Sequence, residues 1–159
     1  MKIPEFLFAL INPIVRTLLN SPAHGFLSGS IVALYFRGRK SGRALCTPVR
    51  YLREGDTLTV VTGADTQWWP NFIETQRIDV QLAGRRKAAQ ATAYRAPDPM
   101  VRAGLSNLLR AHPADAAYLE IHHDKGSGAI DGLWEADSYE NALATAVVVV
   151  IELADDQRQ

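Results

Sequence analysis

The sequence predicts an antiparallel α+β fold whose sheet closes into a small barrel. Six short apolar runs are rich in residues that favour strands, and most of these runs are joined by tight turns. The helical patterns lie at the start of the chain and before its last strand, which argues against the regular alternation of a parallel sheet. Closing the sheet into a barrel removes the exposed edges that it would otherwise present.

The composition is that of an ordinary globular domain. A chain of 159 residues, 47% hydrophobic and 21% charged, can bury one sizeable core but is short for two. We find no repeat, linker or low-complexity tract. We therefore expect a single domain over residues 1–159.

Residues 1–27 predict an amphipathic helical segment with a kink at Pro13. Contact with the barrel is the simpler interpretation, and peripheral contact with a membrane is the alternative. The segment does not reach the roughly 20 uninterrupted apolar residues of a membrane span, and it lacks the pattern of a secretory signal. We therefore expect a cytoplasmic protein, with association at the inner face of the membrane as the alternative.

Each predicted strand has its own signature. The first run is apolar and ends at a glycine-rich basic turn, the fourth alternates cleanly, and the last is apolar throughout, as in a strand buried on both faces. Pro48 within the second run indicates an edge strand or a bulge, because proline cannot donate to a sheet. The predicted strands are Ser30 to Arg37, Ala44 to Arg53, Thr57 to Thr62, Ile78 to Leu82, Ala88 to Tyr94 and Ala144 to Leu153.

Two helices are predicted before the last strand. The first runs from Pro97 to about Ala111, with Asp98 as its N-cap. A second, shorter helix is predicted from Pro113 to Ile121. The segment from His122 to Asn141 is polar and contains glycines, so we expect an irregular surface loop there.

Charge is balanced overall but uneven along the chain. From Arg37 to Arg53 there are six basic residues and no acidic residue, whereas the chain beyond Ala111 holds two basic residues against ten carboxylates. Zero net charge argues against nucleic acid as a partner, because duplex binding needs a broad basic face. A local basic cluster suits a small anionic ligand better.

The centre of this cluster is the turn Gly38-Arg39-Lys40-Ser41-Gly42, followed by Arg43. The glycines allow a sharp turn, arginine offers a planar fork for phosphate oxygens, and lysine adds a movable charge. The turn is therefore a candidate phosphate cradle. A solvated hairpin that keeps a sheet edge soluble is the alternative, and these residues alone leave both interpretations open.

Trp68 and Trp69 form the second unusual feature, next to a short helix predicted from Trp69 to Thr75 with Pro70 in its first turn. Adjacent tryptophans can form an aromatic wall against a flat ring, although core packing is the alternative for at least one of them. Asn71 is expected either to cap the helix or to hydrogen-bond a ligand.

Other kinds of site find little support. The single cysteine, Cys46, cannot form an internal disulfide and is expected to be a structural thiol within a strand. His122 and His123 are adjacent, so their side chains would point in different directions, and we predict no metal site. Hydrolase and Rossmann motifs are missing from the sequence, and it assigns the role of catalytic acid or base to no particular residue.

In their order along the chain, these motifs resemble those of the deazaflavin-dependent nitroreductase family, also called F420H2-dependent quinone reductase-like proteins. The resemblance covers roughly Asn12 to Leu153. It rests on Gly38 to Arg43, Thr47-Pro48, the hairpin Leu52 to Asp56, Trp68-Trp69-x-Asn71-Phe72, the strand end Val80 to Arg85, and a last strand closing on Glu152.

This resemblance implies a split β-barrel like that of FMN-binding proteins, in which reduced coenzyme F420 delivers a hydride to a quinone, nitro compound or activated alkene. It also implies a set of cofactor-binding residues. The basic turn would contact the phosphate and tail, the stretch around Pro48 and the strand end near Val61 and Thr62 would line the ring, and the tryptophan and asparagine would lie beside the cofactor. In this sequence the set is Arg39, Lys40, Ser41, Gly42, Arg43, Pro48, Val61, Thr62, Trp68 and Asn71.

Two alternatives to F420 stay open. The loop Gly63 to Gln67 is short and holds no lysine, which leaves FMN, with its smaller tail, as a possible cofactor on the same barrel. A non-catalytic protein that binds a flavin, haem or lipid-like molecule is the other alternative. The expected partner is a small-molecule electron acceptor, with no nucleic acid, and both a monomer and a homodimer are compatible with the sequence.

Overall fold

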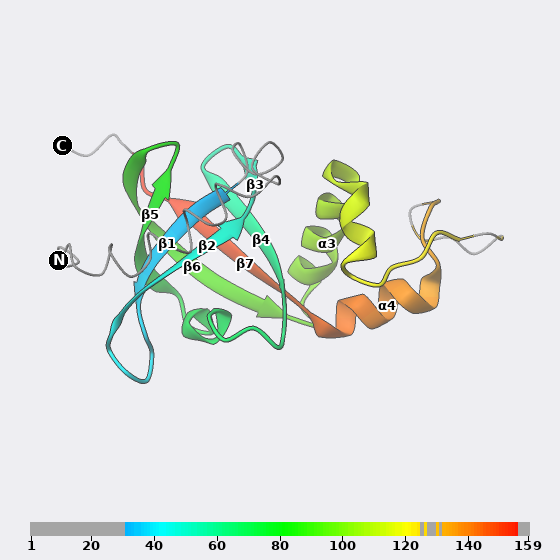
Figure 1. Cartoon of the computed structure of the whole chain (residues 1–159), viewed down its shortest axis with the longest axis horizontal. Coiled ribbons are helices and arrows are strands. Elements are labelled where there is room, and N and C mark those ends of the chain that lie inside the picture. Colours follow the sequence, from blue (N-terminus) through cyan, green and yellow to red (C-terminus); the bar gives the residue numbers. More distant parts are fainter. Residues whose placement is uncertain (1–30, 125, 127–129, 131, 156–159) are drawn as a thin grey trace.

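The computed structural model describes residues 31–124, 126, 130 and 132–155. Within them lies a seven-stranded antiparallel sheet in the order β2-β1-β5-β6-β7-β4-β3, with the α-helices gathered on one side of it (Figure 1). The elements are β1 (Ile31–Arg37), β2 (Ala44–Arg50), β3 (Leu52–Glu54), β4 (Thr57–Gly63), the 3-10 helix η1 (Trp69–Phe72), β5 (Gln76–Leu82), β6 (Arg85–Arg95), α3 (Pro99–Ala111), the 3-10 helix η2 (Pro113–Ala117), α4 (Ala136–Thr145) and β7 (Ala146–Leu153). The helical segment predicted for residues 1–27 lies outside the described residues.

The sheet curls because its two edge strands are neighbours in sequence. β2 and β3 are separated by Tyr51 alone, and one residue spans only about 3.5 Å, so the two edges of the sheet must meet there. β3 pairs with the start of β4 through Leu52 and Thr59, whereas β2 pairs along its length with β1. The sheet is thus joined at Tyr51 and split between β2 and the later part of β4.

This arrangement confirms the predicted antiparallel α+β split barrel. It has seven strands rather than six, because the run predicted as one strand, from Ala44 to Arg53, bends at Tyr51 into β2 and β3. β2 is an edge strand, and Pro48 pairs with Ala33 in an unbroken register, so the proline marks an edge and not a bulge.

β7 is buried on both faces, as its apolar run predicts. Val147, Val149 and Ile151 belong to the core inside the barrel, whereas Val148 and Val150 belong to a second core shared with α3 and α4. Successive side chains of a strand point to opposite faces, so a strand between two cores must be apolar at every buried position. The predicted start at Ala144 is two residues early, because α4 extends to Thr145.

α3 packs closely on β7 because Gly104 has no side chain. A Cβ at Gly104 would lie 2.6 Å from Cγ2 of the fully buried Val148, a distance that only a displacement of the helix or strand would relieve. Asp98 is the N-cap as predicted, since its Oδ1 accepts a hydrogen bond from the Met100 N–H at 2.9 Å, and the helix begins at Pro99, two residues after the predicted start.

The surface loop predicted from His122 to Asn141 is wrong in its second half, where α4 begins at Ala136. Only a narrow face of α4 is apolar, formed by Tyr139, Ala142 and Leu143, so the segment reads as polar in sequence. Tertiary contacts stabilise the helix: Tyr139 is fully buried, and its hydroxyl lies 2.6 Å from Oγ of Ser106 on α3.

Two other predicted helices are shorter in the structure and are 3-10 helices. The helix predicted from Trp69 to Thr75 is the single 3-10 turn η1, with Pro70 in its first turn as expected. The helix predicted from Pro113 to Ile121 ends at Ala117 as η2. Among the helices of the described residues, none has the length and apolar character that crossing a membrane requires.

Candidate functional site

The basic turn between β1 and β2 is closed by its own backbone. The Gly38 N–H donates to Arg43 O, and the Gly42 N–H donates to Gly38 O, both at 2.8 Å. Gly42 has φ of 64°, a conformation that glycine adopts without strain. The Arg43 N–H is bonded to Oγ of Ser41 at 3.2 Å. The glycines thus shape the turn, and their own N–H groups are used within it.

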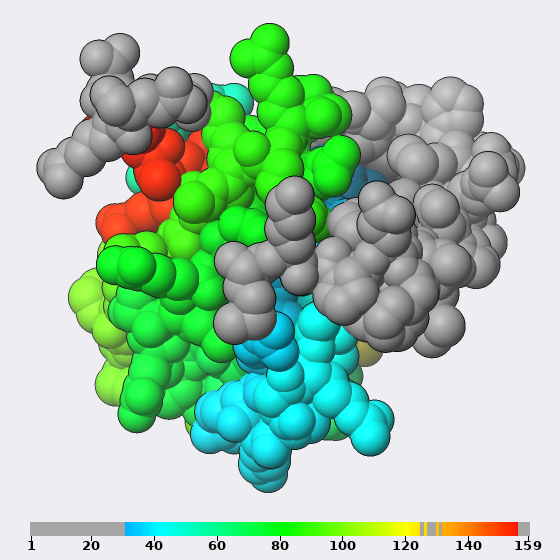
Figure 2. Space-filling view, turned by 90° about the vertical axis from the view of Figure 1, so that its left-hand side faces the viewer, coloured from blue at the N-terminus to red at the C-terminus, as the bar shows by residue number. Residues whose placement is uncertain are grey.

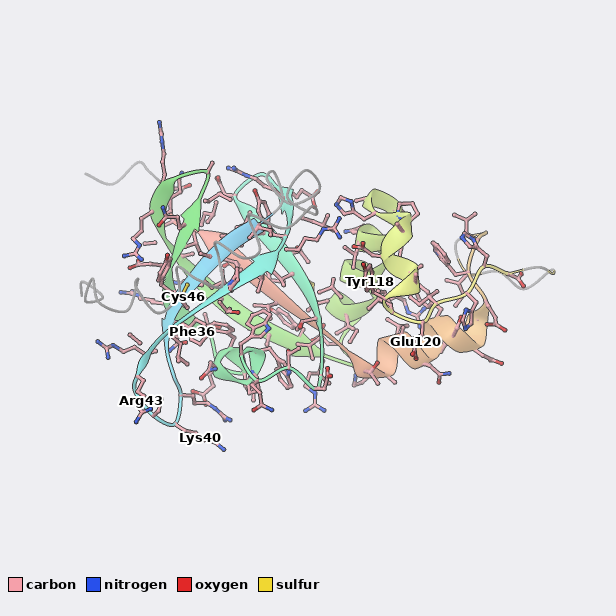
Figure 3. The ribbon with its side chains drawn as sticks, in the orientation of Figure 1. Phe36, Lys40, Arg43, Cys46, Tyr118 and Glu120 are labelled. Carbon is pink, nitrogen blue, oxygen red and sulfur yellow. The ribbon has the colours of Figure 1, made fainter. Side chains whose placement is uncertain are left out.

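Positive charge is concentrated and available at this turn. Arg39, Lys40 and Arg43 are exposed, and within the residues that the structure describes their side chains form no salt bridge. Lys40 and Arg43 extend from the tip of the hairpin, which projects from the end of the molecule beside β5 and β6 (Figures 2 and 3). Over the same described residues, the backbone N–H groups of Lys40 and Ser41 make no hydrogen bond. These groups are suited to bind an anion.

η1 joins the turn to the rest of the predicted site. Oδ1 of Asn71 accepts a hydrogen bond from the Arg39 N–H at 2.7 Å. Nδ2 of the same side chain donates to the carbonyl of Trp68 at 2.8 Å. Residues predicted from two separate motifs are therefore brought together, although 32 positions separate Arg39 from Asn71 in the sequence.

The two tryptophans have different environments. Trp69 is only 6% exposed, belongs to the barrel core, and donates through Nε1 to the carbonyl of Ala64 at 3.1 Å. Trp68 is half-buried and packs on that core, with its ring centre 6.0 Å from that of Phe72. Core packing is therefore the structural role of Trp69, whereas Trp68 retains an accessible surface.

The remaining predicted residues lie on the two strands that border the split. Pro48 is on β2, while Val61 and Thr62 are adjacent on β4 and therefore face opposite ways. Val61 packs against the second core, under the helices, and Oγ1 of Thr62 lies 3.1 Å from Oγ1 of Thr66. The structure therefore does not bring Val61 and Thr62 to one surface.

The turn, the loop Gly63 to Gln67 and η1 lie at the open end of the split. β2 leaves the turn at Ala44, and β4 ends at Gly63, so both strands reach this end away from Tyr51. Figure 1 shows η1 between the β1–β2 hairpin and the end of β4. The predicted residues of the turn, with Trp68 and Asn71, thus lie at the open end of the split, and the other three lie on its bordering strands, with the side chain of Val61 turned toward the helices.

Sequence reasoning missed two residues that anchor the strands of the site, one at the base of the hairpin and one at the other end of β2. Nε2 of Gln76 donates to the carbonyl of Arg37 at 3.1 Å, at the base of the hairpin. Arg50, on the same face of β2 as Pro48, binds Asp115 of η2 through Nη1 at 2.7 Å. Arg50 had a signal in the sequence, since it belongs to the basic stretch, but nothing in the sequence distinguishes Gln76.

A cleft of about 920 Å³ lies beside the hairpin, lined by the ends of β1, β5, β6 and β7. It includes Tyr35, Arg37 and Gln76. None of the ten predicted cofactor residues lines it. The cleft is a neighbour of the basic turn and not part of the predicted site.

Cys46 lies on β2 in contact with Tyr35, whose ring lies 4.1 Å from the guanidinium carbon of Arg86. Burial raises the pKa of the Cys46 thiol, and this outweighs the hydrogen bond with Tyr35 and the charge of Arg86, which both lower it. Burial likewise raises the pKa of the Tyr35 hydroxyl. Within the described residues, no group of histidine, cysteine and carboxylate side chains is arranged to hold a metal ion.

Cys46 is expected to react slowly with thiol reagents. Because its pKa is raised, a smaller fraction of the thiol is ionised at neutral pH than in free cysteine, and only the thiolate is nucleophilic. With a disulfide reagent such as DTNB at pH 7, we expect a rate at least tenfold below that of free cysteine. A rate equal to that of free cysteine would contradict the structural role of the thiol.

The comparisons with known proteins give the family. No curated protein matches the chain. Among solved structures, an F420-H2 dependent reductase is 18% identical with a TM-score of 0.48, covering 76% of this chain and 93% of that one. A structure described as a domain-swapped dimer is 17% identical with a TM-score of 0.49, covering 92% of this chain and 98% of the other. The FAD and heme binding protein from Mycobacterium smegmatis is 15% identical with a TM-score of 0.48, covering 86% and 68%.

With TM-scores below 0.5, these three similarities do not contribute to the assignment. The family match is independent of them and extends over residues 15–121, more than half of the chain. It includes the basic turn, both tryptophans and Asn71. The chain therefore belongs to the F420H(2)-dependent quinone reductase family.

Proposed function

We propose that this protein is an F420H2-dependent reductase that holds the phosphate of the cofactor on the β1–β2 turn and reduces a quinone. Membership of the family supports F420 as the cofactor and a small molecule as the substrate. The observation that carries the proposal is the basic turn itself, which has three exposed cations and whose backbone at Arg39 is linked to the carbonyl of Trp68 through the side chain of Asn71. Nitro compounds and activated alkenes are further candidate acceptors.

The donor set of the turn fits an anionic group. Guanidinium groups of Arg39 and Arg43 offer paired N–H donors, and the ammonium of Lys40 adds a charge on a flexible stem. The N–H groups of Lys40 and Ser41 add neutral donors on the same turn. Such a site holds phosphate by charge and hydrogen bonds, and the bound cofactor supplies the hydride.

For the ring of the cofactor, we propose the residues that border the split. Trp68 offers a half-buried aromatic surface and Thr62 a hydroxyl on the inner face of β4, while Pro48 borders the split from the outer face of β2, the face that carries Arg50. Their part in the reaction is to orient the ring and to exclude water from it. Val61 is left out of this set because its side chain packs under the helices.

FMN is the second candidate cofactor, favoured by the loop at the open end of the split. This loop, Gly63 to Gln67, is short and carries the carboxylate of Asp65 where a basic residue would help to bind a long anionic tail. FMN, with a single phosphate and no further tail, needs no such residue. The turn would then bind the FMN phosphate.

A titration of the purified protein with F420, FMN and haem, followed by fluorescence or absorbance, tests the proposal. We expect micromolar binding of F420 and oxidation of its reduced form by menadione in the presence of the protein. Tighter binding of FMN than of F420 would favour the second candidate. Micromolar binding of none of them would refute both, and binding of F420 without turnover of menadione or nitro compounds would indicate a binding protein.

The location in the cell is also a proposal. We propose a cytoplasmic protein, with residues 1–27 in contact with the inner face of the membrane as an alternative. Fractionation of cells expressing the full chain distinguishes the two, because only the alternative predicts recovery with the membranes. The oligomeric state, monomer or homodimer, is read from light scattering of the same preparation.

A further inference from the structure

We infer that Asn71 is a positioning residue that sets the conformation of the basic turn and fixes it relative to Trp68. This inference rests on the proposed function, because it takes the turn as the site of the cofactor's phosphate. It differs from the sequence-based expectation, in which Asn71 caps a helix or binds the ligand itself.

The orientation of the Asn71 side chain follows from its two partners. The N–H of Arg39 can only donate, so it must face Oδ1, and the carbonyl of Trp68 can only accept, so it must face Nδ2. A flipped amide would place donor against donor and acceptor against acceptor. Both polar atoms of the side chain are therefore engaged with the protein.

The bond to Arg39 is the contact with most effect on the turn. Arg39 lies in the segment that two backbone bonds close, from Gly38 N–H to Arg43 O and from Gly42 N–H to Gly38 O. Because the bond from Asn71 fixes the backbone of Arg39, it also fixes the direction in which the following residues, Lys40 and Ser41, present their free N–H groups. A turn with this bond is preorganised for an anion, and one without it must be ordered on binding.

The bond to Trp68 gives the second half of the inference. The carbonyl of Trp68 receives both Nδ2 of Asn71 at 2.8 Å and the backbone N–H of Asn71 at 3.3 Å. η1 is in turn anchored in the barrel core by the buried Trp69 and Phe72. Asn71 thus attaches an exposed turn to a buried element and holds the phosphate site and the ring site at a constant separation.

Hydrogen exchange measures the positioning without any cofactor. In the Asn71→Ala variant we expect the Arg39 amide to exchange at least tenfold faster than in the native protein, because its acceptor is lost. Asn71→Asp keeps the acceptor for Arg39 but sets its second oxygen against the carbonyl of Trp68, so its exchange rate should lie between those of the native protein and Asn71→Ala. Exchange of the Arg39 amide that is unchanged in Asn71→Ala would overturn the inference and leave the proposed function intact.

Binding measurements test the consequence. We expect Asn71→Ala to raise the Kd for F420 by about three- to tenfold, the size of a lost hydrogen bond, and to leave the Kd for a deazaflavin without phosphate or tail within twofold. Asn107→Ala, an exposed asparagine on α3, should change neither value. An equal loss for both ligands would show that Asn71 acts on the ring or on the fold, and it would overturn the inference.

A double-mutant cycle separates positioning from direct binding. If Asn71 acts through the turn, Asn71→Ala should lower F420 affinity by a smaller factor when Arg39 and Lys40 are already alanine, because only the backbone N–H groups of the turn are then left to be positioned. A full, additive loss in that background would indicate direct contact with the cofactor and would overturn the inference. An Arg39→Ala, Lys40→Ala variant with native affinity would instead refute the proposed function, while the exchange experiment would still stand.

Discussion

Replacing Arg39 and Lys40 together by alanine is expected to lower the affinity for F420 by at least tenfold and to leave the fold intact. Hydrogen bonds to charged groups contribute about 1.5–3 kcal/mol each, so the loss of two such donors exceeds the 1.4 kcal/mol of a tenfold change. Both side chains are exposed, and neither has a salt bridge in the described part of the chain, so stability should change by no more than about 0.5 kcal/mol. Fluorescence titration gives the affinity, and thermal unfolding checks the fold.

A matched control removes the same net charge elsewhere. Arg53 and Arg85 are also exposed on hairpins of the sheet, and their joint replacement by alanine should change the Kd for F420 less than twofold at 0.15 M salt. Equal losses in the two double variants would mean that overall charge, and not the turn, attracts the cofactor.

Replacing Phe72 by alanine is expected to lower the free energy of unfolding by about 3–5 kcal/mol, because it leaves a cavity in the barrel core. Phe72 is fully buried, and its ring centre lies 4.9 Å from that of Phe36 in an edge-to-face contact. Because the same short helix carries Asn71, the variant should also bind F420 more weakly under conditions in which it is folded. Denaturation by urea gives the change in stability.

The neighbouring Ile73 provides the control for this prediction. Its side chain is 51% exposed, so Ile73→Ala should change the free energy of unfolding by only about 0.5 kcal/mol. Phe72→Leu, which keeps most of the volume, should lie between the two. A loss below about 1 kcal/mol for Phe72→Ala would contradict the place of η1 in the core.

The parts of the fold that could be predicted from sequence are those in which a local pattern decides the structure. The apolar run of β7 requires burial on both faces, and Asp98 before Pro99 is a strong signal for the start of a helix. α4 could not be predicted in this way, because its apolar face is narrow and the helix is stabilised by tertiary contacts such as that of Tyr139 with Ser106 on α3. Likewise, the bend at Tyr51 could not be predicted, because it arises where the chain leaves its pairing with β1 as β2 and begins to pair with β4 as β3.

The candidate site shows the same limit. The glycines and cations of the basic turn could be recognised in sequence, because they occupy consecutive positions. Its attachment to η1 could not, since the bond from Arg39 to Asn71 joins residues 32 positions apart. The resemblance implies that Val61 and Thr62 both bind the cofactor, but successive side chains of a strand face opposite ways, and that of Val61 points toward the helices.

The central claim is that the turn from Gly38 to Arg43 binds the phosphate of F420. The most direct test is an NMR titration of the 15N-labelled protein with F420 and with a deazaflavin that lacks the phosphate and tail. We predict that F420 shifts the amides of Lys40 and Ser41 most strongly, because their N–H groups are free in the described structure, and that the shortened compound leaves them within experimental error. Saturation with F420 while the amides of the turn remain unshifted would contradict the claim.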